Sequence, residues 1–209
     1  MLAALEAAYG RAEREEREPL EVLVRGILSQ NTTDTNSDRA YATLRERMPE
    51  WSDVAAADRR RIARAIRCGG LAEQKAATIR NVMRWLRERG GWNLDFLRDL
   101  APPDAERELS AVKGVGIKTA RLALLFGFGW PVFVVDTHVH RVARRLGLVP
   151  DGTSREKTHH LLDGLIPDGD KYAAHLEMIR HGRERCHARS PECEGCPVRR
   201  WCVFVRAAG

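Results

Sequence analysis

The sequence predicts an all-helical protein, and two observations lead to this prediction. Apolar residues recur at spacings of three and four along most segments, as in Val22, Leu23, Ile27 and Leu28, which is the period of one face of an α-helix. Glycine and proline pairs interrupt these segments at short intervals, so the helices should be short. The best strand candidate, residues 131–135, is a brief apolar run that we expect to be a connector. The coarse picture is of about ten short helices.

The elements can be placed in order along the chain. The charged run 11–18 is typical of a solvated helix face. Further on, a charged helix over 104–112 and an apolar helix over 117–126 flank a glycine-containing turn. The connector then ends at Asp136-Thr137, and an Asp or Thr in front of 138–146 is a good N-cap for a helix. No long linker separates these elements, so two lobes would share a close interface.

Composition favours a polyanionic partner. The chain has 209 residues, of which 44% are hydrophobic, enough for a sizeable core. Lys and Arg outnumber Asp and Glu by 35 to 29, and the pI is about 9.4, which suits phosphate binding because counterions are released. Many basic proteins bind no nucleic acid, so this signal alone decides nothing. Charge begins at Glu6, too early for a secretory segment, and no run of about 18 apolar residues occurs, so we expect a soluble intracellular protein.

Four of the five cysteines crowd into one segment near the C-terminus: Cys186, Cys193, Cys196 and Cys202. Their spacing, C-x6-C-x2-C-x5-C, argues against a dispersed disulfide framework and favours a metal site. Four thiolates can hold one zinc ion or one iron–sulfur cluster. Zinc ribbons usually pair two C-x2-C knuckles, whereas this segment has one, so we favour a four-iron cluster. Cys68 stands apart and is interpreted as a small buried hydrophobic residue.

The turn Lys113-Gly114-Val115-Gly116 is a candidate phosphate site. Two glycines two residues apart permit a tight turn whose N–H groups point at an anion beside the start of the next helix. Because this turn joins two helices rather than following a strand, it does not match the dinucleotide-binding pattern of similar appearance.

Two nearby residues could carry covalent chemistry. Lys118 lies in the first turn of the following helix, where the helix dipole and desolvation disfavour its charge, and a neutral amine can attack a sugar carbon and form a Schiff base. Without further context, a surface lysine that binds phosphate is the better interpretation. Asp136 could deprotonate such an amine or stabilise a developing positive charge. It could also serve as an N-cap, and the two roles are compatible.

Three motifs in order carry a family resemblance: GVGIKTA at 114–120, VDTH at 135–138 and the four-cysteine segment. Together they resemble the signature of the helix-hairpin-helix DNA glycosylases, specifically the iron–sulfur-containing endonuclease III family. The resemblance covers essentially the whole chain, because 19–34 resembles the family's first core helix and 70–76 resembles a following loop.

The resemblance implies an all-α, two-lobe fold. One lobe, residues 19–131, would be a six-helix barrel that contains the helix-hairpin-helix. The other, residues 1–18 plus 132–209, would hold a [4Fe–4S] cluster bound by the four clustered cysteines. DNA would lie across the cleft between the lobes.

The resemblance also implies a mechanism. Lys118 would attack C1′ of a flipped nucleotide, while Asp136 would activate the lysine and stabilise the sugar cation. β-Elimination would then cut the strand on the 3′ side. Extruding the nucleotide leaves a hole in the duplex, and Asn31 and Leu71 match the family's filling positions. The remaining DNA contacts implied by the motifs are Lys113, Gly114, Val115, Gly116 and His138.

The expected activity is that of a bifunctional DNA glycosylase and abasic-site lyase that removes oxidised pyrimidines in base excision repair. Three departures from the family pattern put the substrate in doubt rather than the chemistry: Asn31 replaces the usual Gln, Leu109-Ser110 replaces a Leu-Glu pair, and the loop 90–104 is longer. Relatives on the same scaffold act on mismatched thymine or uracil, or on alkylated purines.

Several rival interpretations remain at this point. The adenine glycosylase branch normally lacks the hairpin lysine and has an extra C-terminal domain, whereas this chain ends seven residues after Cys202. A monofunctional mismatch glycosylase typically replaces the lysine. A non-catalytic DNA-binding module with zinc would be colourless and would not need Asp136. A redox protein built around the cluster would leave residues 114–118 unexplained. We expect a monomer that binds damaged or abasic double-stranded DNA, works in the cytoplasm with the nucleoid, and does not bind membranes.

Overall fold

All regular secondary structure is helical in the part that the computed structural model describes, residues 1–207, where no strand occurs. This confirms the predicted fold class. The α-helices are α1 (Leu2–Tyr9), α2 (Pro19–Leu28), α3 (Asp34–Arg47), α4 (Trp51–Ala56), α5 (Arg59–Ala65), α6 (Ala72–Arg87), α7 (Pro102–Ser110), α8 (Ile117–Leu122), α9 (Thr137–Leu146), α10 (Arg155–Leu165), α11 (Lys171–Glu184) and α12 (Val203–Ala207). Shorter helical turns are η1 (Arg67–Gly69), η2 (Asp95–Asp99), η3 (Ala123–Phe128), η4 (Asp168–Asp170) and η5 (Arg199–Trp201). None of these helices is long and apolar enough to cross a membrane.

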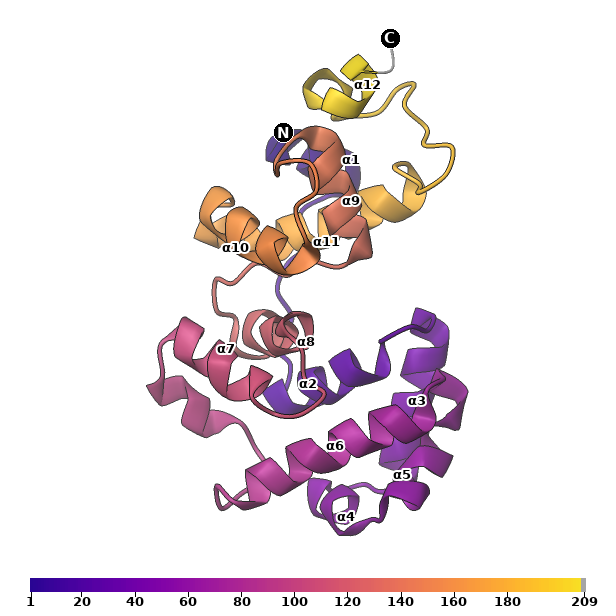
Figure 1. The fold of residues 1–209 in the computed structure, drawn as a ribbon, viewed down its shortest axis with the longest axis vertical. Coiled ribbons are helices and arrows are strands. Elements are labelled where there is room, and N and C mark those ends of the chain that lie inside the picture. The colour runs from indigo at the N-terminus through magenta and orange to yellow at the C-terminus, as the bar shows by residue number, and fades with distance from the viewer. Residues whose placement is uncertain (208–209) are drawn as a thin grey trace. The chain divides into compact units, whose positions relative to one another are not determined.

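The chain divides into two compact units (Figure 1). The hairpin unit is Glu16–Trp130, and the cysteine unit is Met1–Glu15 together with the chain from Pro131 onward. The limits predicted from the sequence, 19–131 and 1–18 plus 132–209, differ from these by a few residues. Each unit has its own core and is described by itself.

Helix α2 is the centre of the hairpin unit. Its start is fixed by Glu18, whose carboxylate accepts hydrogen bonds from the N–H groups of Leu20 and Glu21 at 3.0 and 2.8 Å, and by Pro19 in the first turn. The apolar spacing noted above buries its inner face against α3, α6, α8 and η3. Each fully buried leucine or isoleucine there contributes about 1.5–3 kcal/mol.

The predicted apolar helix after the hairpin forms, but its second half is wider than an α-helix. α8 runs directly into η3, a π-helix that ends at Gly129 with a left-handed φ of 72°. All six residues of η3 are buried. The apolar pattern that predicts a helix over 117–126 does not separate α from π geometry, because both bury the same run.

Helices α1, α9, α10 and α11 build the cysteine unit. α9 and α1 both pack against α11 (Figure 1). The core of this unit includes five completely buried side chains: Leu5, Phe133, Val139, Val142 and Met178.

The connector over 131–135 has no regular structure, as predicted, yet residues 132–135 are buried. Side chains satisfy its backbone instead of a neighbouring strand. Asp163 of α10 accepts from the Phe133 N–H at 2.6 Å, and His175 of α11 bonds the Val134 carbonyl at 2.9 Å through Nδ1. Lys171 Nζ donates to the Pro131 carbonyl at 2.8 Å. The connector therefore delivers the chain to the start of α9 in a fixed conformation.

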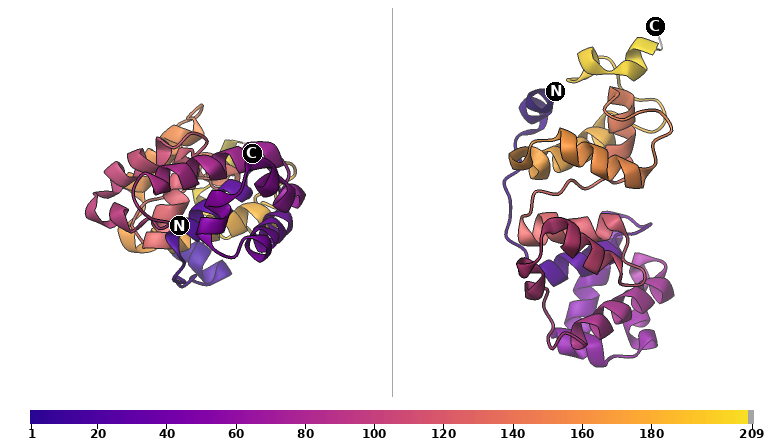
Figure 2. Two further views of the ribbon diagram at one scale, coloured as in Figure 1. Left: turned by 90° about the horizontal axis from the view of Figure 1, so that it is seen from below. Right: turned by 60° about the vertical axis from the view of Figure 1, so that its left-hand side comes forward.

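The interpretation of 11–18 as a helix face is wrong, although the residues are solvated. α1 ends at Tyr9 and is capped by Gly10, which has a φ of 77°, and the following residues form a coil (Figure 2). The charges are used locally. Arg11 forms ion pairs with Glu6 and Asp170 at 3.2 and 3.0 Å, and Glu18 caps the next helix, so neither end of the run favours helix.

Candidate functional site

The predicted phosphate turn is a tight hairpin between α7 and α8. Gly114 has a φ of 97°, a conformation that side chains other than hydrogen rarely permit. A Cβ at this position would lie 2.2 Å from Thr78 Oγ1 of α6. Gly116 forms the N-cap of α8 and has open space around it. Glycine is therefore required at position 114 by the backbone conformation and by Thr78, whereas neither reason applies at position 116.

Within the hairpin, only part of the predicted contact set can reach a ligand with side chains. Lys113 is exposed, whereas Val115 is 4% exposed and packs inward. Val115 can therefore offer only its backbone to a phosphate. Helix α6 holds the turn, because Asn81 Nδ2 donates to the Lys113 carbonyl at 2.9 Å.

Lys118 is half-buried at the second position of α8. The residue after it, Thr119, is buried and lies against Gly26 of α2, where an added Cβ would be 3.2 Å from the threonine methyl. Gln30 Nε2 donates to Thr119 Oγ1 at 3.3 Å. These contacts fix the first turn of α8 to α2 and thereby set the position from which the lysine amine projects.

Asn31 and Leu71, the predicted filling residues, share an unusual backbone. Both lie in the left-handed region, with φ of 49° and 47°, which costs of order 1 kcal/mol or more for a residue with a side chain. Both are exposed, and Leu71 exposes 49% of its surface. An exposed leucine held in a strained conformation has no packing reason to be there, and such residues gather at functional sites.

In the cysteine unit, Asp136 caps α9. One of its carboxylate oxygens accepts from the Val139 N–H at 2.7 Å, and the side chain is half-buried. This confirms the N-cap prediction. A carboxylate has two oxygens, so capping through one is compatible with a second role.

His138 lies in the first turn of α9, and neighbouring residues fix its position. Its Nδ1 lies 3.1 Å from Arg141 Nη2. Gly182 of α11 makes room for it, because a Cβ there would lie 2.8 Å from the His138 Cβ. The ring is half-buried, so one edge remains able to contact a ligand.

The four clustered cysteines line one pocket. Cys186, Cys193, Cys196 and Cys202 are all free thiols, and the other lining residues include apolar side chains of α9, α12 and the loop between α11 and α12. Among the described residues, no group of three or more His, Cys, Asp or Glu side chains forms a single-ion site. Burial raises the pKa of the Cys196 thiol, and the other three cysteines raise it further. A bound cationic cluster would reverse this, because ligating thiols are deprotonated.

Two arginines one turn apart on α9 hold the cysteine segment. Arg145 Nη1 donates to Cys186 Sγ at 3.2 Å and to the His187 carbonyl at 2.6 Å. Arg141 donates to the carbonyls of Cys186 and Gly182 at 2.8 and 2.7 Å. Arg141 therefore joins His138 to the first cysteine.

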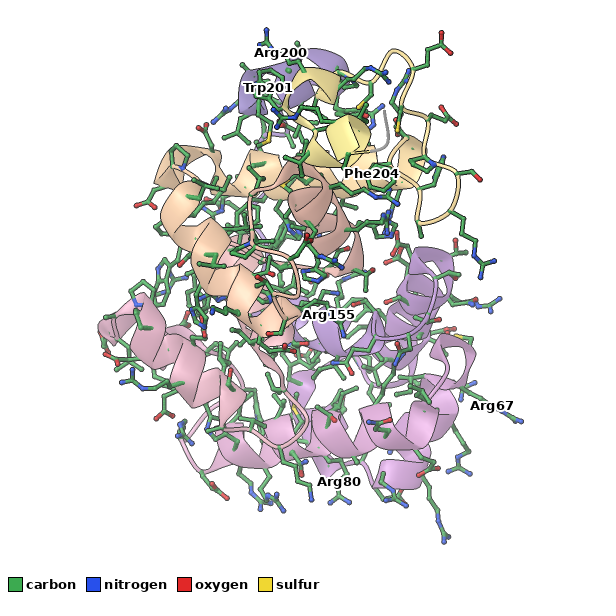
Figure 3. All side chains as sticks on the ribbon, turned by 45° about the horizontal axis from the view of Figure 1, so that its top comes forward. Arg67, Arg80, Arg155, Arg200, Trp201 and Phe204 are labelled. Carbon is green, nitrogen blue, oxygen red and sulfur yellow. The ribbon has the colours of Figure 1, made fainter. Side chains whose placement is uncertain are left out.

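Each unit also has an arginine-lined hollow. The one in the hairpin unit has a volume of about 260 Å³ and is lined by α6 and its neighbours. The one in the cysteine unit, of about 560 Å³, lies over α9 and α12. Figure 3 shows Arg67 and Arg80 extending outward from the hairpin unit. The positive charge inferred from composition is therefore gathered on surfaces that can meet phosphates.

The site has structural partners that sequence reasoning did not identify: Thr78 and Asn81 of α6, and Arg141 and Arg145 of α9. The four-residue spacing of the two arginines places them on one helix face, which is a usable signal. Nothing in the sequence links Thr78 or Asn81 to the hairpin. Cys68 was predicted to be a buried hydrophobic residue, but it is only half-buried; its Sγ lies 3.9 Å from the Asn36 carbonyl within the hairpin unit.

Two family models match the chain. Residues 24–168 match the HhH-GPD superfamily of base excision DNA repair proteins. Residues 186–202 match the iron–sulfur binding domain of endonuclease III. The first match includes the hairpin and Asp136, and the second begins and ends on clustered cysteines.

Curated relatives agree with these models. Endonuclease III of Thermotoga maritima is 35% identical over 194 residues, which cover 93% of this chain and 87% of that protein. Endonuclease III of Escherichia coli is 31% identical over 186 residues, which cover 89% of this chain and 84% of that protein. An Arabidopsis thaliana protein whose name assigns it provisionally to the DNA glycosylases is 44% identical over 172 residues, but this chain spans only 59% of its length.

Solved structures are similar along the whole chain. A trapped covalent intermediate of endonuclease III with DNA superimposes with a TM-score of 0.83 at 29% identity, covering 99% of this chain and 94% of that one. A non-covalent endonuclease III–DNA complex gives the same values. A thermostable thymine-DNA glycosylase, at 21% identity and a TM-score of 0.79, shares the fold.

Proposed function

Because the chain belongs to the endonuclease III family within the HhH-GPD superfamily of base excision DNA repair proteins, we propose that Lys118 is its nucleophile and Asp136 its general base. The family's activity, DNA glycosylase with abasic-site lyase, is the activity of this chain. The assignment of Lys118 as the nucleophile depends on its position in the structure. Lys118 is a half-buried amine in the first turn of α8, directly after the hairpin that would bind a phosphate.

The reaction balances with these two residues. The Lys118 amine attacks C1′, the bond from C1′ to the base breaks, and the base leaves with a proton. The sugar ring then opens to give a protonated Schiff base between C1′ and Nζ. Loss of a C2′ proton drives β-elimination, which breaks the C3′–O bond and cuts the strand on the 3′ side.

Asp136 would serve both halves of this sequence. Its carboxylate can take the proton that the Lys118 ammonium must lose before the neutral amine attacks, and its charge can stabilise the cationic sugar as the base departs. Because it also caps α9, its position is set by the helix and by the buried connector before it. We assign the role to the oxygen that does not cap Val139.

DNA recognition divides among three groups of residues. The backbone N–H groups of Gly114, Val115 and Gly116, with the Lys113 ammonium, would bind phosphate, and His138 would contact the sugar–phosphate backbone. Leu71 and Asn31 would fill the space left by the extruded nucleotide. Their exposure and strained backbone support this assignment, since it needs side chains presented to the duplex in a fixed direction.

The residues of the C-terminal segment fit the [4Fe–4S] cofactor predicted from the sequence. We assign its four ligands to Cys186, Cys193, Cys196 and Cys202, because all four thiols are free and line one pocket. When bound, the cluster supplies a rigid cross-link for this loop. Arg145, donating to Cys186 Sγ, would stabilise the ligand's negative charge.

We propose oxidised pyrimidines as the substrate class, in double-stranded DNA, with abasic sites as a second substrate. The presence of Lys118 supports a lyase step. We further propose that the protein acts as a monomer on the nucleoid in the cytoplasm. The monomer is supported by the burial of most large apolar side chains among the described residues.

Borohydride trapping tests the chemistry. Wild-type protein is mixed with duplex DNA that carries thymine glycol or an abasic site, and borohydride reduces any Schiff base to a stable adduct. Lys118→Gln should abolish the adduct. Asp136→Asn should lower adduct formation by orders of magnitude while keeping α9 stable, because Asn caps a helix about as well as Asp.

A matched control is Lys113→Gln, which removes a positive charge from the same hairpin. It should weaken DNA binding and still give adduct at saturating protein. Base release without any adduct would make the enzyme monofunctional and reduce Lys118 to a phosphate contact. Absence of both products on every lesion, with duplex binding intact, would reject the catalytic assignment.

A further inference from the structure

One lysine in the hairpin unit is buried where a charge is costly. Lys75, in the second turn of α6, exposes 2% of its surface and is among the largest fully buried side chains of the described residues. Within residues 1–207, no carboxylate is paired with it. Burial lowers the pKa of Lys75, since the charged form is desolvated.

The ammonium is satisfied entirely by backbone oxygens. Nζ donates to the carbonyl of Leu28 and to the carbonyl of Gly69, each at 2.7 Å. Leu28 ends α2 and Gly69 ends η1, so both carbonyls belong to helix ends whose oxygens lack a partner within the helix. The negative ends of these helices offset part of the cost of the buried charge.

These two carbonyls lie two or three residues before the two strained residues. Asn31 follows Leu28 by three positions, and Leu71 follows Gly69 by two. The Lys75 backbone N–H donates in addition to the Leu71 carbonyl at 3.0 Å. Lys75 therefore forms hydrogen bonds next to both loops that carry the proposed filling side chains, although the loops lie about 40 residues apart in the sequence.

The strained backbone of Asn31 and Leu71 explains why these hydrogen bonds are needed. Each left-handed non-glycine residue costs of order 1–3 kcal/mol and persists only where its surroundings fix it. Asn31 and Leu71 are exposed, so their own side chains make little packing that could hold the backbone. Fixing the carbonyl before each one limits the conformations that the following loop can reach.

We propose that Lys75 is a positioning residue that clamps the Asn31 and Leu71 loops in register, so that both side chains enter the duplex together when a nucleotide is extruded. This inference rests on the proposed roles of those two residues and goes beyond them, because the buried Lys75 side chain would act through the two loops and not by contact with DNA. Its effect should fall on base extrusion and leave the amine chemistry of Lys118 intact.

The test compares Lys75→Met with the wild-type protein. Methionine keeps most of the side chain and removes all three donors, so the two carbonyls lose their shared partner. Single-turnover excision of thymine glycol from duplex DNA should fall about 10- to 100-fold, the scale of a small misplacement of a reacting group. Borohydride trapping on a single-stranded abasic oligonucleotide, where no base need be extruded, should change little.

A fluorescence measurement follows extrusion without chemistry. 2-Aminopurine placed opposite the lesion brightens when the duplex around it is opened. Wild-type protein should produce this signal on binding, and Lys75→Met should reduce it at saturating protein. If wild-type protein gives the signal but no adduct, the proposed catalytic function fails while the clamp remains testable.

A double-mutant cycle separates clamping from a general loss of stability. In a Leu71→Ala background, Lys75→Met should have little further effect on the fluorescence signal, because residues that act through one loop are not additive. Lys171→Met is the matched control. Lys171 is also buried, at 4% exposure, and bonds a carbonyl at 2.8 Å, but it lies in the cysteine unit, so its effect should add to that of Leu71→Ala. Unlike Lys75, it also pairs with Asp163 and Asp168, so its removal should cost at least as much stability.

Three results would overturn the clamp: wild-type fluorescence in Lys75→Met, additivity with Leu71→Ala, or equal losses on duplex lesion and single-stranded abasic DNA. If Lys75→Met does not fold, Lys75→Gln serves in its place. Its shorter amide can donate to one carbonyl or the other, and a partial loss of the fluorescence signal is expected.

Discussion

The two units place their functional residues by different means. In the hairpin unit, side chains of one helix, α6, fix both the loops and the turn: Lys75 bonds the loop carbonyls, Thr78 fills the space at Gly114, and Asn81 bonds Lys113. In the cysteine unit, the segment from Cys186 to Cys202 has little regular structure and depends on arginines of α9 and on its ligands. Packing alone can therefore order the first region, whereas the second also needs a cofactor.

The largest effect should come from removing a cluster ligand. Cys196→Ser should abolish the visible absorbance of the cluster, and trypsin should then cut within residues 185–200, because the loop loses its cross-link. Limited proteolysis with mass spectrometry measures this. Cys68→Ser is the matched control, and it should keep both colour and resistance. A coloured, resistant Cys196→Ser protein would show that the arginines alone hold the loop.

The next effect tests the hairpin, where packing does the positioning. Gly114→Ala should destabilise the protein by about 1–3 kcal/mol, because its Cβ meets Thr78 and its φ is positive. Gly116→Ala should change stability by less than about 0.5 kcal/mol, since space is open there. Urea unfolding measures both. If Gly116→Ala nevertheless weakens DNA binding, Gly116 is needed for close approach of the phosphate; equal destabilisation by both would contradict the structure.

A smaller effect is expected at Arg141, which joins His138 to Cys186. Arg141→Lys keeps the charge but cannot reach acceptors in two directions at once. The free energy of unfolding should fall by about 1–2 kcal/mol, and DNA binding should weaken through His138. Arg144→Lys on the same helix is the control, because Arg144 is exposed and pairs only with exposed Asp151. Equal effects of the two substitutions would remove Arg141 from the connection.

The contrast between the units also explains what the sequence could predict. Local patterns predict Asp136 as an N-cap, the connector before it, the hairpin and the cysteine set, because each depends on residues close in sequence. The prediction of a helix over 11–18 was wrong because Arg11 pairs with Asp170 and Glu18 caps α2. The spacing of charged residues in the sequence does not reveal these contacts. Lys75, Thr78 and Asn81 were beyond reach because their roles depend on partners about 30–50 positions away.

The smallest effect concerns a buried charge without the compensation that Lys75 has. Glu177 of α11 is 4% exposed, and its Oε1 has no hydrogen-bond partner among the described residues. Burial, and next Glu6, raises the pKa of Glu177 above 4.5. In the folded protein it therefore keeps its proton to higher pH than in the unfolded chain, so its contribution to stability is present below pH 4.5 and is lost as the pH rises through the folded pKa.

Glu177→Gln should accordingly stabilise the protein by about 1 kcal/mol at pH 8, and the gain should shrink as the pH approaches 4.5. Urea unfolding at both pH values measures the difference. Glu184→Gln on the same helix should change little at either pH, because its ion pair with Arg180 is exposed. A loss of stability in Glu177→Gln at pH 8 would mean that this carboxylate, like the Lys75 ammonium, is held by interactions that offset its burial. The two buried charges would then be alike in energy and would differ only in what they position.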